Sequence, residues 1–368
     1  MEEDQFIPGN ILFIDDRSIK TLNLETAETW LIAGDITTPG YREGVGDSAR
    51  FNIRYSIHHR NATDLIVSEV ENNCIRTLSR LTNETKKLVG LCGTQGNVDG
   101  SFGVARLGFP EKMTEIEPNV FAFNDVAYKS IRLLDLGTER VSTLRSFREY
   151  VYGLVKRPNS QDLIVSFSGS LGKVNLCNGK AVYLAKVPYD EAPPRDGPLT
   201  VSPFRNAIFS VRPETLYFLD ENTMLTAGFH SHLVRVVDFA SAYVTSICEA
   251  SAERSTTTSG YIETCQLSNP RSLLAIPSLD LVIIGLGKSI GFNNEISGLP
   301  SNFPKMSVTA AQQQQQQQQP QLHQHRLSGL QQAQHLRHWS QLIQVMVLKA
   351  IGKACGIMVS IKPMCISS

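Results

Sequence analysis

The sequence lacks the features that mark several large protein classes. None of its seven cysteines forms a CxxC pair, which argues against a structural zinc site. The first ten residues, MEEDQFIPGN, are acidic and have neither the basic nor the apolar region of a signal peptide. No uncharged apolar run approaches the roughly 18 residues that a transmembrane helix needs. Basic and acidic residues number 35 each, so net charge gives no bulk attraction to nucleic acid or membranes.

These absences predict a soluble protein without a membrane span, intracellular as the sequence is written. An odd, scattered set of cysteines predicts buried, unpaired thiols. Two glycosylation sequons begin at Asn61 and Asn83, and both would accept glycans if an upstream signal sequence made the protein extracellular. A three-residue pattern also arises by chance in a chain of this length. The sequence therefore leaves the compartment and the oligomeric state open.

An internal repeat organises the first three quarters of the chain. Apolar runs of β type lead through a polar turn to a second apolar run in residues 11–22, 65–78 and 120–134, as in a hairpin. The apolar anchors of the second runs, Ile19, Ile75 and Ile131, are 56 residues apart. Weaker copies follow at Val174, Val234 and Ile290, with steps of 43, 60 and 56 residues.

A glycine-rich loop recurs with the same period. Ala33-Gly34 leads to Ala49-Arg50-Phe51, and Cys92-Gly93 leads to Ala105-Arg106-Leu107. Periods of about 40 to 60 residues with several short strands each are typical of β-propeller blades. The chain shows little helical periodicity before residue 305, so these features predict an all-β propeller rather than an α/β fold or a helical solenoid.

The order of these features resembles the NHL repeat. A small residue and glycine, a glycine-rich loop, Ala-Arg-Phe/Leu, an apolar run, an acidic residue, a turn and Ile-Arg follow one another in both. The acidic position is occupied by Asp15, Glu69 and Asp125. The resemblance covers roughly Ile11 to Ile290 and implies a propeller of about six NHL-type blades. Val174 and Ile290 lack the basic residue that the pattern expects next.

The two ends of the repeat do not complete a ring. The first copy begins at its outer hairpin without an inner strand, and the last copy ends after a middle strand, so we expect a propeller incomplete at both ends. The predicted organisation is a lead-in at residues 1–10, the propeller at 11–291, a glutamine-rich linker at 292–326 and a tail at 327–368. Eight consecutive glutamines at 312–319 predict disorder. The apolar spacing from Leu327 to Ala350 predicts an amphipathic helix, which either docks a partner or has no role.

The basic residues beside the anchors form the candidate binding set: Lys20, Arg76, Arg132 and Arg235. At one height around a ring they would make a positive annulus, and some NHL propellers bind RNA on such a face. The interpretation we favour is that these side chains point to water or pair with acidic residues of the neighbouring blade. The acidic residues Asp15, Glu69 and Asp125 recur at the same period and could neutralise them.

Nothing in the sequence predicts catalysis, a metal or a cofactor. His58-His59 and His230-Ser231-His232 are the histidine clusters of the propeller, and neither supplies three zinc ligands. We expect a non-enzymatic scaffold that binds a protein partner through its propeller loops. RNA binding by the basic annulus is the first alternative, and a fragment without independent function is the second.

Overall fold

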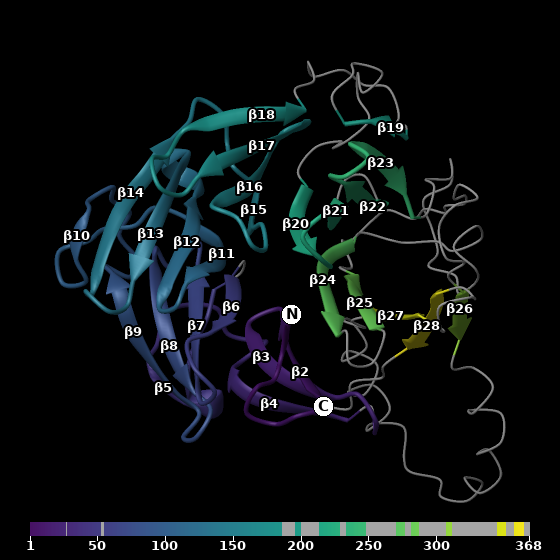
Figure 1. Cartoon of the computed structure of the whole chain (residues 1–368). Coiled ribbons are helices and arrows are strands. Elements are labelled where there is room, and N and C mark those ends of the chain that lie inside the picture. Colours follow the sequence, from purple (N-terminus) through teal and green to yellow (C-terminus); the bar gives the residue numbers. More distant parts are fainter. Residues whose placement is uncertain are drawn as a thin grey trace, which may run out of the picture. The chain divides into compact units, whose positions relative to one another are not determined.

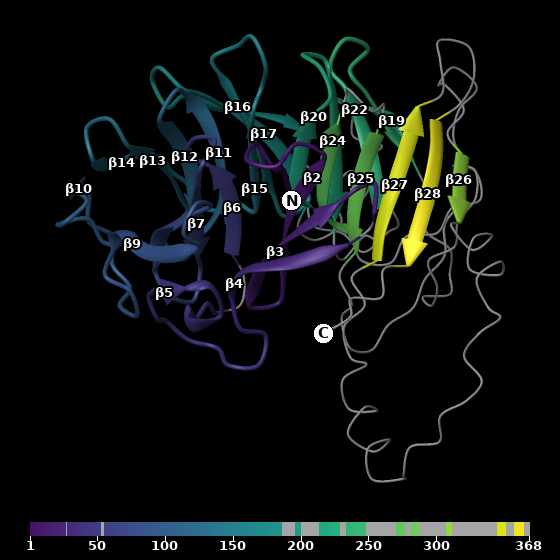
Figure 2. The same ribbon diagram turned by 90° about the horizontal axis from the view of Figure 1, so that it is seen from below.

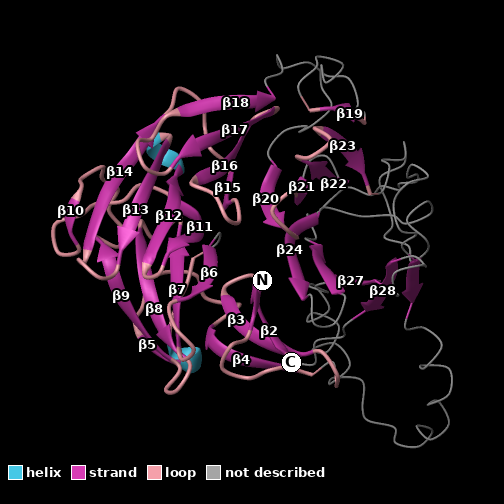
Figure 3. Ribbon diagram, in the orientation of Figure 1, coloured by secondary structure: helices cyan, strands magenta, loops and turns pink. Residues whose placement is uncertain are grey.

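The structure is a computed structural model in which nearly every regular element is a strand (Figure 3). It describes residues 1–26, 28–52, 55–185, 196–199, 213–228, 233–247, 270–276, 281–286, 307–310, 344–350 and 357–363. Within these ranges the helices are 3-10 turns of three residues, η1 (Gly46–Ser48) and η2 (Val126–Tyr128), too short for a membrane crossing. The chain divides into one unit of Met1–Ser231 with Arg235–Thr245, and a second of His232–Val234 with Ser246–Ser368.

The first unit contains a five-bladed β-propeller, which confirms the predicted all-β fold with five blades in place of about six (Figure 1). Blade 1 consists of β1 (Glu2–Glu3), β2 (Asn10–Asp15), β3 (Ser18–Asn23) and β4 (Thr29–Gly34). Blade 2 consists of β5 (Gly44–Val45), β6 (Tyr55–His59), β7 (Asp64–Glu69), β8 (Cys74–Ser79) and β9 (Glu84–Gly90). Blade 3 consists of β10 (Gly100–Ser101), β11 (Pro110–Glu117), β12 (Val120–Asp125), β13 (Ser130–Asp135) and β14 (Arg140–Ser146).

The last two blades follow the same antiparallel plan. Blade 4 consists of β15 (Gly153–Lys156), β16 (Asp162–Phe167), β17 (Ser170–Asn175) and β18 (Ala181–Ala185). Blade 5 consists of β19 (Gly197–Pro198), β20 (Pro213–Phe218), β21 (Thr223–Gly228), β22 (Leu233–Asp238) and β23 (Tyr243–Ser246). At the end of each sheet opposite β5 or β10, strands of neighbouring blades lie against one another, as β6 and β11 do, and β11 and β15. These strands form the inner edge of each blade.

The first repeat copy has an inner strand after all. β1 pairs with β2 through Glu2 opposite Leu12 and Glu3 opposite Ile11. The expectation that this copy starts at its outer hairpin is therefore wrong. A two-residue polar strand has too little apolar pattern to be recognised in sequence.

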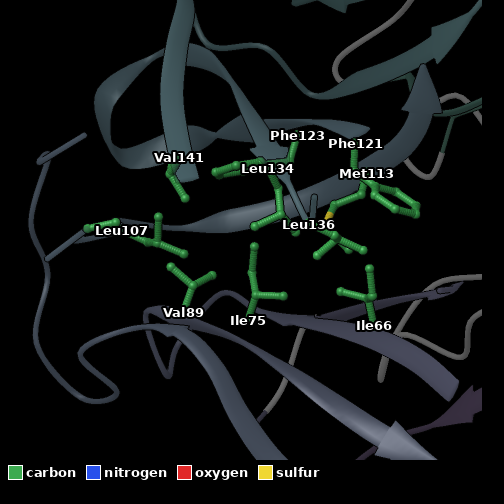
Figure 4. Close-up of a cluster of buried hydrophobic side chains, with 11 residues drawn as sticks. Ile66, Ile75, Val89, Leu107, Met113, Phe121, Phe123, Leu134, Leu136 and Val141 are labelled. Carbon is green, nitrogen blue, oxygen red and sulfur yellow. The ribbon is translucent and has the colours of Figure 1, made fainter. Parts of the chain in front are cut away.

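Apolar side chains between the blades form the core. Ile66 and Ile75 of blade 2 face Phe123 and Leu134 of blade 3 in one such cluster (Figure 4). All four side chains are buried, and each contributes about 1.5–3 kcal/mol when removed from water. Equivalent clusters join blades 1 and 2, 3 and 4, and 4 and 5. Because blades 2, 3 and 4 each have a neighbour on both faces, their strands are buried on both sides.

A β-bulge recurs on the outer strand of blades 1 to 4. The register shifts opposite Ile19/Lys20, Ile75/Arg76, Ile131/Arg132 and Leu171/Gly172. The fourth anchor is therefore Leu171, and not Val174 as the sequence interpretation had it. Both side chains are fully buried, so their hydrophobicity does not distinguish them.

The second unit has a sheet of its own, in the order β24-β25-β27-β28-β26. Its strands are β24 (Pro270–Ile276), β25 (Leu281–Leu286), β26 (Ser307–Ala310), β27 (Gln344–Ala350) and β28 (Ile357–Pro363). β27 lies where the sequence predicted the end of an amphipathic helix. Its backbone pairs along the whole length of β25, and its run of Val, Met, Val and Leu also suits a strand. The glutamine tract lies outside the described residues.

Candidate functional site

The basic residues beside the anchors are internal. The side chains of Arg76 and Arg132 are fully buried. Arg76 Nη1 lies 2.9 Å from Glu69 Oε1, and Arg132 Nη1 lies 3.2 Å from Asp125 Oδ2. Burial raises the pKa of the Glu69 and Asp125 carboxyls, and the guanidinium groups beside them oppose that shift. Both acidic partners were among those that the sequence indicated.

These arginines hold the loops that connect successive blades. Arg132 donates through Nη1 to the Arg106 carbonyl at 2.8 Å and through Nη2 to the Val98 carbonyl at 2.8 Å. Arg76 donates to the carbonyls at the same two sequence separations, 26 and 34 residues before it. A buried guanidinium with five N–H donors can satisfy a carboxylate and two backbone carbonyls at once. The arginine at this position therefore determines the path of the glycine-rich loop.

The other two basic residues are also paired. Lys20 Nζ lies 2.6 Å from Asp15 Oδ2, and Arg235 Nη2 lies 3.1 Å from Asp196 Oδ1. Burial lowers the pKa of Arg235, and Asp196 opposes that shift. The four residues therefore do not form an exposed positive annulus, because each is paired with an acidic residue.

The described histidines attach the start of the chain to blade 2. His58 Nδ1 lies 2.9 Å from Glu2 Oε1, and His59 Nε2 lies 2.7 Å from the Glu3 carbonyl oxygen. Burial disfavours the charged Glu2 carboxylate, but His58, the chain's N-terminal amine and His59 together outweigh this effect and hold its pKa below the usual value. His230-Ser231-His232 lies outside the described residues. Within the described ranges, no group of three or more histidine, cysteine or acidic residues could hold a metal ion.

Two of the seven cysteines are joined, contrary to the prediction of unpaired thiols. Cys74 and Cys92 form a disulfide with a Cα–Cα distance of 5.1 Å. Cys74 begins β8 at the place that Ser18 and Ser130 take in blades 1 and 3, and Cys92 follows β9. Sequence spacing alone cannot assign such a pairing. Cys177 is an exposed free thiol, and the other four cysteines lie outside the described residues.

The two sequons lie in turns, as expected. Asn61 is exposed in the turn between β6 and β7, where its Oδ1 accepts hydrogen bonds from the Thr63 N–H at 2.8 Å and hydroxyl at 3.1 Å. Asn83 has a positive φ of 55° in the turn before β9 and is half-buried. Glycosylation of either residue remains a prediction.

Exposed apolar side chains lie on two connecting loops that leave the blades. Ile36, Tyr41 and Leu91 are 44%, 41% and 43% exposed, and we call them the loop surface. The buried Asn72 joins the two loops. Its side-chain Nδ2 donates to the Gly40 carbonyl at 3.1 Å, and its backbone carbonyl accepts the Gly93 N–H at 2.8 Å.

Tyr41 is held in place by its neighbours. Its ring centre lies 5.1 Å from the Arg76 guanidinium carbon, and its hydroxyl donates to Glu43 Oε1 at 2.9 Å. Burial and this hydrogen bond raise the pKa of Tyr41 to about 12. The sequence interpretation missed the loop surface, because single apolar residues in polar loops carry no periodic signal.

Comparisons with known proteins add structural neighbours only. No family model and no curated protein matches the sequence, so the NHL resemblance stays a prediction. A chain of a nidogen/laminin complex is similar with a TM-score of 0.49 and 10% identity, covering 75% of this chain and 88% of that one. A Bacteroides thetaiotaomicron protein of unknown function is similar with a TM-score of 0.44 and 13% identity, covering 78% of this chain and 83% of that one.

Proposed function

We propose that this chain is a non-enzymatic scaffold that binds a protein partner through the loop surface. The observation that carries the proposal is the exposure of Ile36, Tyr41 and Leu91 on two loops that Asn72 ties together. Tyrosine is among the residues enriched as anchors of protein interfaces, and exposed apolar surface marks interaction sites.

The frame under these loops favours recognition over catalysis. Arg76 and its counterpart Arg132 hold the connecting loops by hydrogen bonds to their backbone carbonyls. A partner would therefore meet a preformed surface, and the loops would lose little conformational entropy on binding. RNA binding at the four anchor positions has no support from this geometry, because their charges are paired inside the blades.

The test compares purified wild-type chain with an I36S/Y41S/L91S variant in affinity capture from cells that express the protein. Leu81→Ser is the matched control, since Leu81 is 68% exposed in a turn outside the loop surface. The proposal expects a protein that binds wild type and the control, is lost with the triple variant, and binds again when both components are purified. Retention by the triple variant would refute the loop surface as the site, and loss on ribonuclease treatment would favour an RNA bridge.

A further inference from the structure

Three blades carry a short extra strand on their outer edge. β5 pairs with β9, β10 with β14, and β19 with β23, as Figure 2 shows for β5 beside β9. Each extra strand comes from the loop before its blade and begins with a glycine that follows an acidic residue. The three pairs are Glu43-Gly44, Asp99-Gly100 and Asp196-Gly197.

The acidic residue fastens the extra strand to the blade. Asp99 Oδ2 accepts the Thr143 N–H of the outer strand at 2.8 Å, and Asp99 Oδ1 lies 2.8 Å from Arg132 Nη2. Glu43 Oε1 accepts the equivalent Lys87 N–H at 2.9 Å. The hydrogen bond from Lys87 lowers the pKa of Glu43, and the charge of Arg76 adds to this effect. In blade 3 the carboxylate thus meets both an outer-strand N–H and the cation of β13. Blade 2 shows the N–H contact of this unit, and blade 5 shows the cation contact, between Asp196 and Arg235.

Blade 1 has the receiving half of this unit. Lys20 lies opposite Leu31 in the register that places Arg132 opposite Thr143. The sheet ends at β4, with no further strand on this edge among the described residues. Two adjacent large side chains, Trp30 and Leu31, are exposed here at 47% and 44%. The equivalent residues in blades 2 and 3, which have a covering strand, are Lys86-Lys87 and Ser142-Thr143.

Blade 4 provides an internal contrast. Its sheet also has four strands, and the connection before it is only residues 147–152. The residue at the position of Lys20 is Gly172, which has no charge to offer a carboxylate. Blade 4 also exposes two apolar side chains at the positions of Trp30 and Leu31, since Val182 and Tyr183 are 43% and 42% exposed. The outer edge of blade 1 therefore differs from that of blade 4 in its cation and not in its apolar strand.

We propose that the outer edge of blade 1 binds an extended segment of a protein partner in which Asp or Glu precedes Gly. The segment adds antiparallel to β4, with its glycine opposite Thr29, as Gly44 lies opposite Thr85 in blade 2. Its carboxylate accepts the Leu31 N–H and pairs with Lys20, and its flanking side chains cover Trp30. Strand addition supplies backbone hydrogen bonds, and the carboxylate supplies the specificity. This site goes beyond the proposed function, because it uses other residues than the loop surface and either can fail alone.

The probe is a fluorescein-labelled peptide with the sequence of residues 96–104, GNVDGSFGV, which covers blade 3 in the structure. Fluorescence anisotropy with the full chain should show saturable binding. We expect at least a tenfold weaker affinity for the peptide with Asn in place of Asp, and the same loss for Lys20→Met protein with the original peptide. Lys86→Met protein is the matched control, because Lys86 is an exposed lysine of the outer strand of covered blade 2, and it should bind as wild type does.

Several results would overturn the proposal. The absence of saturable binding up to about 1 mM peptide, or equal affinity for the Asp and Asn peptides, would remove the acidic-glycine recognition. Slow amide exchange at Thr29–Leu31 in the isolated monomer would show that the chain covers this edge itself. A dimer in sedimentation velocity that Lys20→Met dissociates would assign the edge to a second copy.

Discussion

Replacement of the buried Arg132 by leucine tests whether the repeat arginines hold the propeller together. Leucine retains part of the apolar volume but removes one donor from each of four polar groups: the carboxylates of Asp125 and Asp99 and the carbonyls of Val98 and Arg106. Asp99 is partly exposed and can be hydrated, and the Val98 and Arg106 carbonyls each keep a hydrogen bond from the other residue's backbone N–H, so the cost comes chiefly from Asp125.

The expected cost is about 4 kcal/mol of unfolding free energy. Breaking a buried ion pair from one side costs about 3–5 kcal/mol, because the remaining charge stays desolvated. Asp125 keeps its hydrogen bonds from the Gly108 N–H at 2.9 Å and the Phe109 N–H at 2.8 Å, which places the expected value inside this range rather than above it. A loss of this size lowers the melting temperature by roughly 8–16 °C for a unit of this length.

The assay is thermal unfolding together with amide exchange resolved by peptide. Arg132→Leu should increase exchange across residues 97–107 before any other part of blade 3. Lys86→Leu is the control, since its ion pair with Glu84 is exposed and should contribute less than about 1 kcal/mol. A single variant within about 1 kcal/mol of wild type would refute the reasoning.

Three further outcomes follow from the same geometry. Oxidised, denatured protein should resist alkylation at Cys74 and Cys92 in peptide mass spectra, and Cys74→Ser should cost about 3 kcal/mol, because the bond closes a loop of sequence separation 18. Gly90→Ala should destabilise by more than about 2 kcal/mol in urea unfolding, since φ is 98° and a Cβ would lie 2.7 Å from the Asn73 carbonyl oxygen, whereas Gly103→Ala meets no atom and should be near neutral. Tyr41 should titrate at about 12 by NMR, so that the stability of the folded state falls as the pH rises from 10 towards 12, because the folded protein retains the phenol proton that the unfolded chain loses.

The repeat and the all-β class were predictable because they depend on spacing and composition. Strand-turn-strand patterns recur every 56 residues at Ile19, Ile75 and Ile131, and the structure places all three at the same point of their blades. The sequence interpretation placed the anchor of blade 4 at Val174, the next buried apolar position after the true anchor, Leu171. Each third strand buries two such positions three residues apart, as Leu171 and Val174 show, and only the backbone register separates them.

The environment of the basic residues was harder to predict. Successive side chains of a strand point to opposite faces of the sheet, so in a sheet with one exposed face Arg76 and Arg132 would point into water. Both faces of blades 2 and 3 are covered, and both arginines are buried. Alternation of apolar and polar residues therefore does not indicate exposure here. The recurring acidic residues at Glu69 and Asp125 were the correct signal that these charges are paired. The disulfide and the extra strands could not be predicted, because each depends on a contact between segments that are distant in the sequence.

The presence or absence of an extra strand explains why the repeats differ in length. In blades 2, 3 and 5 an acidic-glycine loop and a cation at the third-strand position occur together. In blade 4 the loop is short and the cation is replaced by Gly172, so that Leu171 follows Ile131 by only 40 residues. Cation and acidic loop thus behave as one unit, present or absent as a pair. Blade 1 is the exception, because Lys20 is there and no described segment covers β4. Lys20 pairs with Asp15 as Arg132 pairs with Asp125, and Arg132 also binds the Asp99 carboxylate of the extra strand. By the same arrangement Lys20 can receive a second carboxylate, which at this open edge another protein would supply.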